Sequence, residues 1–340
     1  MSQKSKVLAL KYRPSDFKDL IGQKVIAETI YNSIKSNKIP NAYLFTGIRG
    51  VGKTTIARII AKALNCKNGL ENLCIDNFCE NCEAISQSNH IDVFELDAAS
   101  RSSVENTKEL IEFSRYPPTS SNYKIYILDE CHMLSRQAWN SLLKTLEEPP
   151  DYLRFIFATT EIKKIPVTVI SRCQRYDLSR VKFEELFNYL KKIALLEKGK
   201  LSEDVLKLIS KISEGSVRDA LSLLDRALIA SSENKELNLT DALKIFGYFD
   251  KTYLIELLEN LLYGDEKKLI ETYKSIYDAG IEAKVFLNDF LEILYYLKNI
   301  DFIKLNGTNF NLNDQEFKKI LEISKKVSSE TILLYWQFTI

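Results

Sequence analysis

The sequence predicts an α/β domain whose parallel sheet carries helices on both faces, followed by an all-helical region. Three observations lead to this prediction. A glycine-rich loop at residues 47–55 lies between a short apolar run and a helical pattern. Strand-like apolar runs then alternate with helical patterns up to residue 178, an order that favours a parallel sheet. Beyond residue 178 only helical patterns remain.

Composition limits the class of protein. A chain of 340 residues is expected to form two or three domains, and its 45% apolar and 27% charged residues are typical of globular proteins. The net charge of +1 means that binding to nucleic acid would depend on a local patch. Without a transmembrane-length apolar run or a signal peptide at the N-terminus, we expect a cytoplasmic protein. In that compartment six cysteines are expected to be thiols or metal ligands.

Before the loop, residues 11–14 read KYRP and residues 21–23 read IGQ, and a helix is predicted over residues 24–36. Pro14 favours an extended entry to this segment. From these residues alone, a plain N-terminal arm and a segment that binds a base are equally good interpretations.

The loop itself, GIRGVGKTT, matches the phosphate-loop pattern G-x-x-x-x-G-K-[ST]. Its glycines let backbone N–H groups approach phosphate oxygens, Lys53 can reach the β- and γ-phosphates, and the Thr54 hydroxyl can bind Mg²⁺. A helix is predicted directly after the loop, so its N-terminus would face the phosphates. We therefore interpret the loop as a nucleoside triphosphate site rather than a chance match.

Four cysteines follow the predicted loop helix: Cys66, Cys74, Cys79 and Cys82. The Cys79-x-x-Cys82 spacing is that of a metal knuckle, and four thiols suffice for tetrahedral Zn²⁺. We predict a structural zinc site, with a disulfide or incidental thiols as the alternatives. No histidine or carboxylate completes an open site there, so a catalytic zinc is not expected.

Next, a strand is predicted over residues 91–96, followed by a helix that Ser102 or Ser103 would cap and that runs to residue 114. Arg101 and Lys108 lie near the start of this helix. By their sequence context alone, solvated surface charges are the better interpretation of both residues.

The run at residues 124–130, KIYILDE, is typical of a buried parallel strand. Asp129 and Glu130 end it, at the edge where such sheets bind ligands. Paired with the phosphate loop, Asp129 is suited to the Mg²⁺ shell and Glu130 to polarising the attacking water. Cys131 is interpreted as a packing residue. His132 is left unassigned, because a surface position and a supporting position behind the site residues are equally good interpretations.

Further strands are predicted at residues 154–159 and 174–178, around a helix at 136–146. Thr159 and Thr160 end the first of these strands, where hydroxyls could contact the γ-phosphate or the water, or simply end a strand. Arg172 lies in a Ser-Arg-Cys motif before the last strand. Helical patterns cover residues 182–197, 202–213 and 216–231, with Arg218 in the first turn of the third, and a second helical set starts near residue 239.

Taken together, these motifs resemble those of AAA+ ATPases of the clamp-loader group. The phosphate loop, the Asp-Glu pair, the paired threonines, the Ser-Arg-Cys motif, the GSVRDAL segment and the four-cysteine insert carry the resemblance. KYRP, IGQ, DAASR, SLLKTLEEPP and PVTVISRCQ also read as segments of the gamma and tau subunits of the bacterial DNA polymerase III clamp loader. The likeness extends over essentially the whole chain.

The resemblance implies a role for each motif residue. The triphosphate site would consist of Gly47, Gly50, Val51, Gly52, Lys53, Thr54 and Thr55, with Pro14 near the adenine. Thr54 and Asp129 would hold Mg²⁺, and Glu130 would act on the water. Thr160, with Thr159 beside it, would be the first sensor and Arg218 the second.

Contacts with other molecules are implied as well. Arg172 would reach the ATP of a neighbouring subunit, with an intrachain ion pair as the alternative. Arg101 and Lys108 would contact the DNA backbone. The four cysteines would bind Zn²⁺, although the spacing between Cys74 and Cys79 is longer than the family's usual Cys-x-x-Cys.

The implied architecture has three parts: an AAA+ P-loop ATPase domain at residues 1–178 with the zinc insert at 66–82, a helical lid at 179–242 and an all-α collar for oligomerisation at 243–340, which we expect to be truncated. The partners would be delta, delta-prime and further gamma/tau copies in a hetero-pentamer, the sliding clamp and primed DNA. Single-strand-binding protein would be met indirectly, and no membrane contact is expected.

The implied function is ATP-driven opening and loading of the sliding clamp, within a polymerase holoenzyme but without a polymerase active site in this chain. Two alternatives stay open. An ATPase-inactive structural subunit would lack ATP binding, which the intact loop and Asp-Glu pair argue against. A hexameric AAA+ DNA helicase would separate strands without a clamp, and the cysteine insert argues against it.

Overall fold

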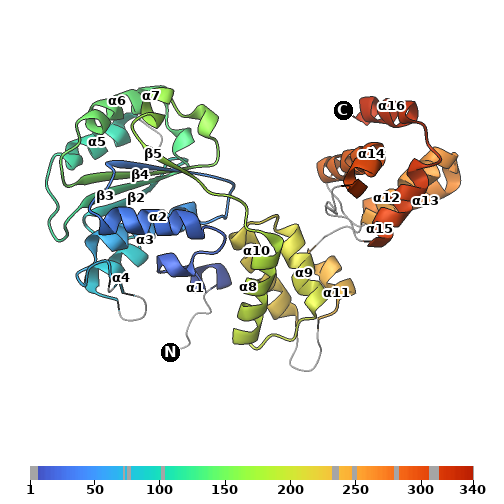
Figure 1. Ribbon diagram of the computed structural model, residues 1–340, viewed down its shortest axis with the longest axis horizontal. Coiled ribbons are helices and arrows are strands. Elements are labelled where there is room, and N and C mark those ends of the chain that lie inside the picture. The colour runs from blue at the N-terminus through green and yellow to red at the C-terminus, as the bar shows by residue number, and fades with distance from the viewer. Residues whose placement is uncertain are drawn as a thin grey trace. The chain divides into compact units, whose positions relative to one another are not determined.

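The structure is a computed structural model that describes residues 7–339 apart from residues 72, 75–77, 101–103, 232–236, 247–250, 279–282 and 306–313. The chain divides into two compact units, Met1–Ile229 and Ala230–Ile340 (Figure 1). Each unit has a core of its own and is described separately.

The first unit is built on a five-stranded parallel sheet. Its strands are β1 (Ala42–Thr46), β2 (Val93–Asp97), β3 (Lys124–Asp129), β4 (Leu153–Thr159) and β5 (Gln174–Asp177), in the spatial order β2-β3-β4-β1-β5. Every neighbouring pair is parallel, so the carboxyl ends of all five strands lie at one edge. The predicted α/β class is therefore confirmed.

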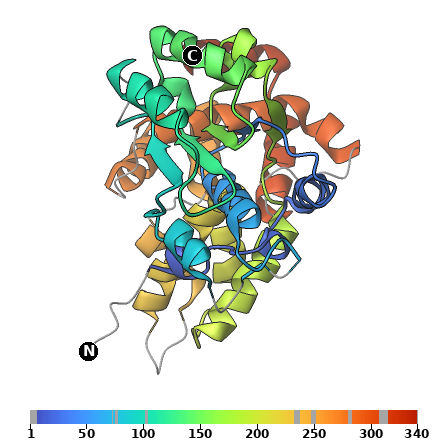
Figure 2. The ribbon, with the colours of Figure 1, turned by 90° about the vertical axis from the view of Figure 1, so that its left-hand side faces the viewer.

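Helices cover both faces of this sheet, and alternate strand residues feed two separate cores. Tyr43 and Phe45 of β1 pack with the helix α3 (Lys53–Asn65), while Leu44 faces the core that contains Trp139. Helices α2 (Lys24–Lys35), α3 and α4 (Glu80–Ser86) lie on one face, and α5 (Val104–Ser114), α6 (Arg136–Glu147) and α7 (Val167–Ile170) lie on the other (Figure 1 and Figure 2). Because both faces are covered, β1 and β4 are buried along their whole length.

Predicted and observed elements differ mainly at their ends. Strand β2 begins at Val93, two residues later than predicted, because residues 91–92 form a turn. The cysteine insert, where no helix was predicted, contains the helix α4, whose N-terminal flanking residue is Cys79. Short helices also occur at α1 (Leu8–Lys11), η1 (Phe17–Asp19), η2 (Cys131–Met133) and η3 (Ile162–Lys164).

Three helices complete the first unit: α8 (Phe183–Leu196), α9 (Glu203–Ile212) and α10 (Val217–Ala230). The Ser202 side chain caps α9 by accepting a hydrogen bond from the backbone N–H of Val205. The turn before α10 contains Gly215, whose φ of +82° is in the left-handed region that favours glycine. This turn places the start of α10 against the phosphate loop. There the backbone N–H of Arg218 donates a hydrogen bond to the Gly50 carbonyl at 3.3 Å.

The second unit is all-helical. It contains α11 (Leu239–Phe246), α12 (Lys251–Tyr263), α13 (Glu266–Asp278), α14 (Ala283–Leu305), α15 (Asp314–Ser324) and α16 (Ser329–Thr339). Leu258, Leu294 and Ile320, from α12, α14 and α15, are each at most 1% exposed and meet in one core. A cavity of about 600 Å³ in this unit is lined by apolar residues such as Tyr273, Phe290 and Phe338.

Candidate nucleotide-binding site

The glycine-rich loop connects β1 to α3 at the carboxyl edge of the sheet. Gly50 and Gly52 have φ values of +79° and +106°, which residues with a side chain rarely adopt. A Cβ on Gly50 would lie 2.1 Å from the Ser216 hydroxyl oxygen, so a larger residue would also separate the loop from α10. The loop therefore needs glycine both for its own bend and for the close approach of α10.

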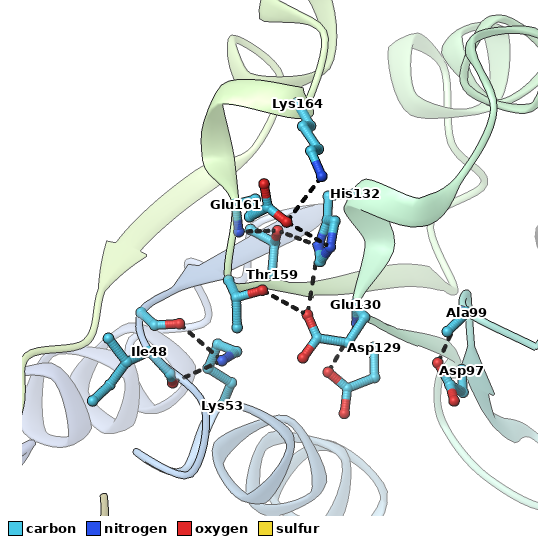
Figure 3. Close-up of polar contacts among 12 residues, drawn as sticks. Ile48, Lys53, Asp97, Ala99, Asp129, Glu130, His132, Thr159, Glu161 and Lys164 are labelled. Carbon is cyan, nitrogen blue, oxygen red and sulfur yellow. Dashed lines mark hydrogen bonds and ion pairs between the residues drawn. The ribbon is translucent and has the colours of Figure 1, made fainter. Parts of the chain in front are cut away.

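The loop lysine is already oriented toward the space that the loop encloses. Lys53 Nζ donates to the carbonyls of Gly47 and Ile48, both at 2.9 Å (Figure 3). The residue is only 5% exposed, and burial lowers the pKa of its ammonium group. A buried ammonium with only carbonyl partners gains from an anion beside it.

The two predicted Mg²⁺ ligands meet although they are far apart in the sequence. The Thr54 hydroxyl, in the first turn of α3, donates to Asp129 Oδ2 at 2.5 Å, at the end of β3. A hydroxyl and a carboxylate are the hard oxygen ligands that Mg²⁺ prefers, so these residues fit the ion.

Glu130 follows Asp129 in an uncommon backbone conformation. Its φ of +46° and ψ of +42° lie in the left-handed region, and its N–H donates to Asp129 Oδ1 at 3.0 Å. Such conformations cost energy and are concentrated at functional sites. Its carboxylate accepts a hydrogen bond from the Thr160 hydroxyl at 3.1 Å (Figure 3). The two predicted catalytic side chains, Glu130 and Thr160, are thereby in direct contact.

Lys53, Thr54, Asp129 and Glu130 line a cavity of about 830 Å³ within the first unit, whereas Gly47 and Thr160 are not among the described residues of its lining. Its lining combines the N-terminal arm, the phosphate loop, the ends of β2 and β3, and α10; it includes Arg13, Pro14, Arg49, Gly50, Val51, Gly52, Lys53, Thr54, Thr55, Arg58, Glu95, Asp129, Glu130 and Arg218. The structure thus brings Pro14 and Arg218 to the same cavity as the loop.

Arg13 and Arg58 also line this cavity, and neither was among the site residues predicted from the sequence. Arg13 Nε donates to the Thr55 hydroxyl at 3.2 Å, and burial, reinforced by nearby Arg58, lowers the pKa of Arg13 to about 10. Arg58 forms two hydrogen bonds of 2.7 Å with the Glu95 carboxylate. The only signal for Arg13 was its place in KYRP, and nothing in the sequence pairs Arg58 with Glu95.

Two other predicted residues, Arg172 and Lys108, are not among the described residues that line the cavity. Arg172 forms an ion pair with Glu147 and donates to the Thr168 carbonyl at 2.5 Å. Lys108 is exposed on α5. Arg101 and the predicted capping serines lie outside the described residues.

At the other end of α3, all four cysteines of the insert come together. Their sulfur atoms lie within 4.8 Å of one another, and Cys66 Sγ and Cys74 Sγ are 3.6 Å apart. In a tetrahedral zinc site with Zn–S bonds of about 2.3 Å, sulfurs are separated by ~3.8 Å. The geometry therefore fits a four-thiolate metal site and includes Cys74 despite its unusual spacing.

The protonation of these thiols also depends on their burial. Burial, reinforced by Cys66 and Cys79, raises the pKa of the fully buried Cys82. For Cys79 the effect of burial is outweighed by hydrogen bonds, first from backbone N–H groups, and its pKa is lowered to about 7. Because thiolates are the metal-binding form, a cation would release protons from this cluster as it binds.

Three family models match the chain. The model described as "DNA polymerase III, delta subunit" matches residues 22–182, and the model "DNA polymerase III clamp loader subunit, ATPase lid domain" matches residues 185–233. The model "DNA polymerase III subunits gamma and tau domain III" matches residues 237–340. Among the described residues, every helix is too short or too polar to cross a membrane.

Curated relatives agree with these matches. The DNA polymerase III subunit gamma of Buchnera aphidicola subsp. Schizaphis graminum is 41% identical over 325 residues, which cover 94% of this chain and 88% of that protein. The subunit gamma of the subspecies Baizongia pistaciae is 41% identical over 338 residues, covering 97% and 89%. The subunit tau of Escherichia coli is 35% identical over 332 residues; these cover 97% of this chain but 51% of tau.

Among solved structures, the Holliday junction branch migration motor RuvB of Thermotoga maritima matches with a TM-score of 0.51 and 18% identity, over 74% of this chain and 79% of that chain. At this identity the likeness shows the fold alone. The two gamma subunits, in contrast, share over 40% of their residues with this chain along nearly its whole length. The chain therefore belongs to the family of gamma and tau subunits of bacterial DNA polymerase III.

Proposed function

We propose that this chain is an ATP-hydrolysing subunit of the DNA polymerase III clamp loader. In this role ATP binding and hydrolysis drive the opening of the sliding clamp and its loading onto primed DNA. One observation supports the enzymatic role above all: Lys53, Thr54, Asp129 and Glu130 converge on one cavity. A purely structural subunit has no need for this set. The likeness to RuvB extends to the fold and gives no support for a helicase.

Within this proposal, each residue acts through the geometry described above. Loop N–H groups from Gly47 to Thr55 and the Lys53 ammonium bind the triphosphate, with Pro14 beside the adenine. Thr54 and Asp129 hold Mg²⁺, which neutralises charge on the phosphates when bound. Glu130 orients the water and accepts its proton. Thr160 and Arg218 contact the γ-phosphate from β4 and from α10.

Arg172 is proposed to act on the ATP of a neighbouring subunit. Its ion pair with Glu147 is partly exposed, and such pairs are worth only ~0–1 kcal/mol. The guanidinium can therefore exchange Glu147 for a phosphate oxygen at low cost. Arginines supplied in trans contribute on the order of 10³ to 10⁵ in rate.

A mixing experiment tests this role of Arg172. Assembled Arg172→Ala subunits should keep wild-type ATP affinity while hydrolysis falls at the neighbouring site by about 10³-fold or more. Arg175→Ala is the matched control, because Arg175 forms an exposed ion pair with Asp177 and both residues lie in β5. The alternative outcome is that Arg172→Ala lowers the melting temperature and reduces hydrolysis only in proportion to the loss of folded protein. In that case the role of Arg172 is the intrachain ion pair.

The four cysteines are proposed to bind one structural Zn²⁺ per chain. The fit of their sulfur positions and their burial support this assignment. The site is closed on all sides by thiols, so the ion would stabilise the insert and take no part in hydrolysis. Metal analysis of the reduced, folded protein should find about one zinc per chain.

Three functional regions follow from the proposal: an ATPase domain at residues 1–178, a lid at 179–242 and an oligomerising collar at 243–340. The boundaries of the matched family models lie close to these limits and support them. The collar would join the chain to delta, delta-prime and further gamma/tau copies. Such an assembly belongs to the cytoplasm, where the clamp and primed DNA are found.

DNA contact is proposed for Arg101 and Lys108. Lys108 is exposed on α5, consistent with a directed phosphate contact in a protein of low net charge. Lys108→Ala in the assembled complex should weaken binding to every primed template. The slope of log binding constant against log salt concentration should become shallower by about one. An unchanged slope would make Lys108 an ordinary surface charge.

The overall proposal is tested by reconstituting the chain with delta-type subunits and the clamp. Wild-type complex should hydrolyse ATP and load the clamp onto primed DNA, and the reaction should stop when Glu130 is replaced by Gln. Loading that survives this substitution in every copy would contradict the proposed function.

A further inference from the structure

We propose that His132 is a positioning residue for ATP hydrolysis: its imidazole links the Glu130 carboxylate to the end of β4. The inference rests on the proposed function and adds a residue to it. His132 lies on the short helix η2, two residues after Glu130, and its side chain is 7% exposed. A buried imidazole needs polar partners, so its contacts specify its position.

The imidazole has polar groups at both of its nitrogens (Figure 3). Nδ1 lies 3.1 Å from the Thr159 hydroxyl and 3.5 Å from Glu130 Oε2. Nε2 lies 3.5 Å from Glu161 Oε1, and Glu161 in turn pairs with Lys164 at 2.9 Å. The ring thus lies between Glu130 on one side and residues 159–161 on the other.

This arrangement is fixed at both ends. The Thr159 hydroxyl, fully buried at the end of β4, also accepts a hydrogen bond of 3.0 Å from the Glu161 N–H. On the other side, the Met133 N–H donates to the Glu130 carbonyl at 2.9 Å and closes the turn that carries His132. The ring therefore has little freedom, and a proton carried on Nδ1 would be donated toward the Thr159 and Glu130 oxygens.

Glu130 Oε2 is consequently approached by two groups, the His132 ring and the Thr160 hydroxyl. Thr159 contacts the His132 ring and Thr160 contacts Glu130 directly. Because these threonines are consecutive, a movement of the end of β4 changes the contact of His132 with Glu130 and the contact of Thr160 with Glu130 together. This links the segment that faces the γ-phosphate to the carboxylate that acts on the water. Neither His132 nor Thr159 is among the described residues that line the cavity, so the link should affect turnover and not nucleotide binding.

Steady-state hydrolysis and nucleotide affinity in the assembled complex test this link. His132→Ala should lower kcat about 10- to 100-fold, the loss expected when a catalytic group is misplaced by ~1 Å, with KM and the nucleotide Kd unchanged. His132→Asn should recover most of kcat, because its amide nitrogen can occupy the Nδ1 position. His132→Gln should not, because its longer side chain places the amide near the Nε2 position.

The chain's second histidine provides the matched control. His90 is also buried, and its Nδ1 accepts a hydrogen bond from the Asp92 N–H at 3.0 Å; His90 is not among the described residues that line the cavity. His90→Asn should leave kcat unchanged. A purely structural role for His132 would instead lower stability and activity in parallel and would make the Asn and Gln variants equivalent.

Failure of the inference is distinguishable from failure of the proposed function. A wild-type complex without ATP hydrolysis contradicts the function. If the wild type hydrolyses ATP and Glu130→Gln stops it, then wild-type kcat in His132→Ala, or equal kcat in the Asn and Gln variants, overturns only the role of His132. Should His132→Ala fail to fold, the comparison of the Asn and Gln variants decides.

Discussion

The two ends of helix α3 are built for opposite purposes. At its N-terminal end, Lys53 and Thr54 face an open cavity of about 830 Å³ lined by charged side chains. At its C-terminal end, the chain passes directly into Cys66, which belongs to a group of thiols packed against one another and largely buried. In the proposed function, one helix thus connects a cavity that would exchange its nucleotide to a thiol cluster that would hold its metal ion permanently.

The physical difference lies in where the polar groups find partners. At the open end, the first N–H groups of the helix have no partner within the helix, and the Lys53 ammonium is buried. Both favour the binding of an anion, and the helix dipole adds positive charge there. At the closed end the helix dipole is negative, and the basic residue Lys62 lies in the last turn. Its Nζ is 4.4 Å from the centroid of the Phe78 ring. Burial of Lys62 lowers its pKa, and the nearby Cys82 and Cys74 sulfurs oppose that effect. Changes at one end of α3 should therefore leave the other end intact.

The largest expected effect comes from Glu130→Gln. The amide keeps the shape of the side chain but cannot accept the proton of water, so turnover should fall by about 10²- to 10⁴-fold. ATP affinity and zinc content should remain at wild-type values, as measured by nucleotide titration and metal analysis. Glu148→Gln, an exposed carboxylate at the end of α6, is the control. Loss of nucleotide binding in Glu130→Gln would refute the assigned role.

A smaller effect is expected from Lys53→Ala. Hydrogen bonds to a charged group are worth ~1.5–3 kcal/mol, so ATP affinity should fall about 10- to 100-fold. Zinc content should again be unchanged. Lys164→Ala, which removes an exposed ammonium from η3, should bind ATP normally. Equal ATP affinity in Lys53→Ala and the wild type would show that the lysine does not contact the phosphates.

Cys82→Ser tests the closed end. Loss of one thiol from the cluster should abolish zinc binding and cost ~2 kcal/mol or more, which lowers the melting temperature by about 4–8 °C. ATP affinity of the folded protein should be unaffected, because the insert lies outside the cavity lining. Cys173→Ser removes a half-buried thiol outside the cluster and should retain zinc. A parallel loss of zinc and ATP affinity in Cys82→Ser would show that the two ends of α3 are coupled.

Much of the fold was predictable because its signals are local. The buried runs of β1, β3 and β4 have the continuous apolar character of parallel strands, and the predicted ends of β3 and β4 lie within two residues of the observed ones. The phosphate loop and the Asp129-Glu130 pair are contiguous in sequence, so their motifs identify them directly. The helix α4 was missed because its short stretch around Cys82 has few apolar residues to reveal a helical period.

The sequence by itself determined the fold class, the nucleotide site and the set of four cysteines, because each depends on residue types at short, fixed spacings. Only the tertiary structure brought Arg13 to Thr55, Thr54 to Asp129 and His132 to Thr159. Each of these pairs joins segments that are far apart in the chain. Asp129 and Thr159 reach their partners because β3 and β4 end at one edge of the sheet, whereas Arg13 reaches Thr55 because the N-terminal arm lies against the start of α3. Contacts of this kind depend on packing across the sheet, and no local pattern of residues encodes them.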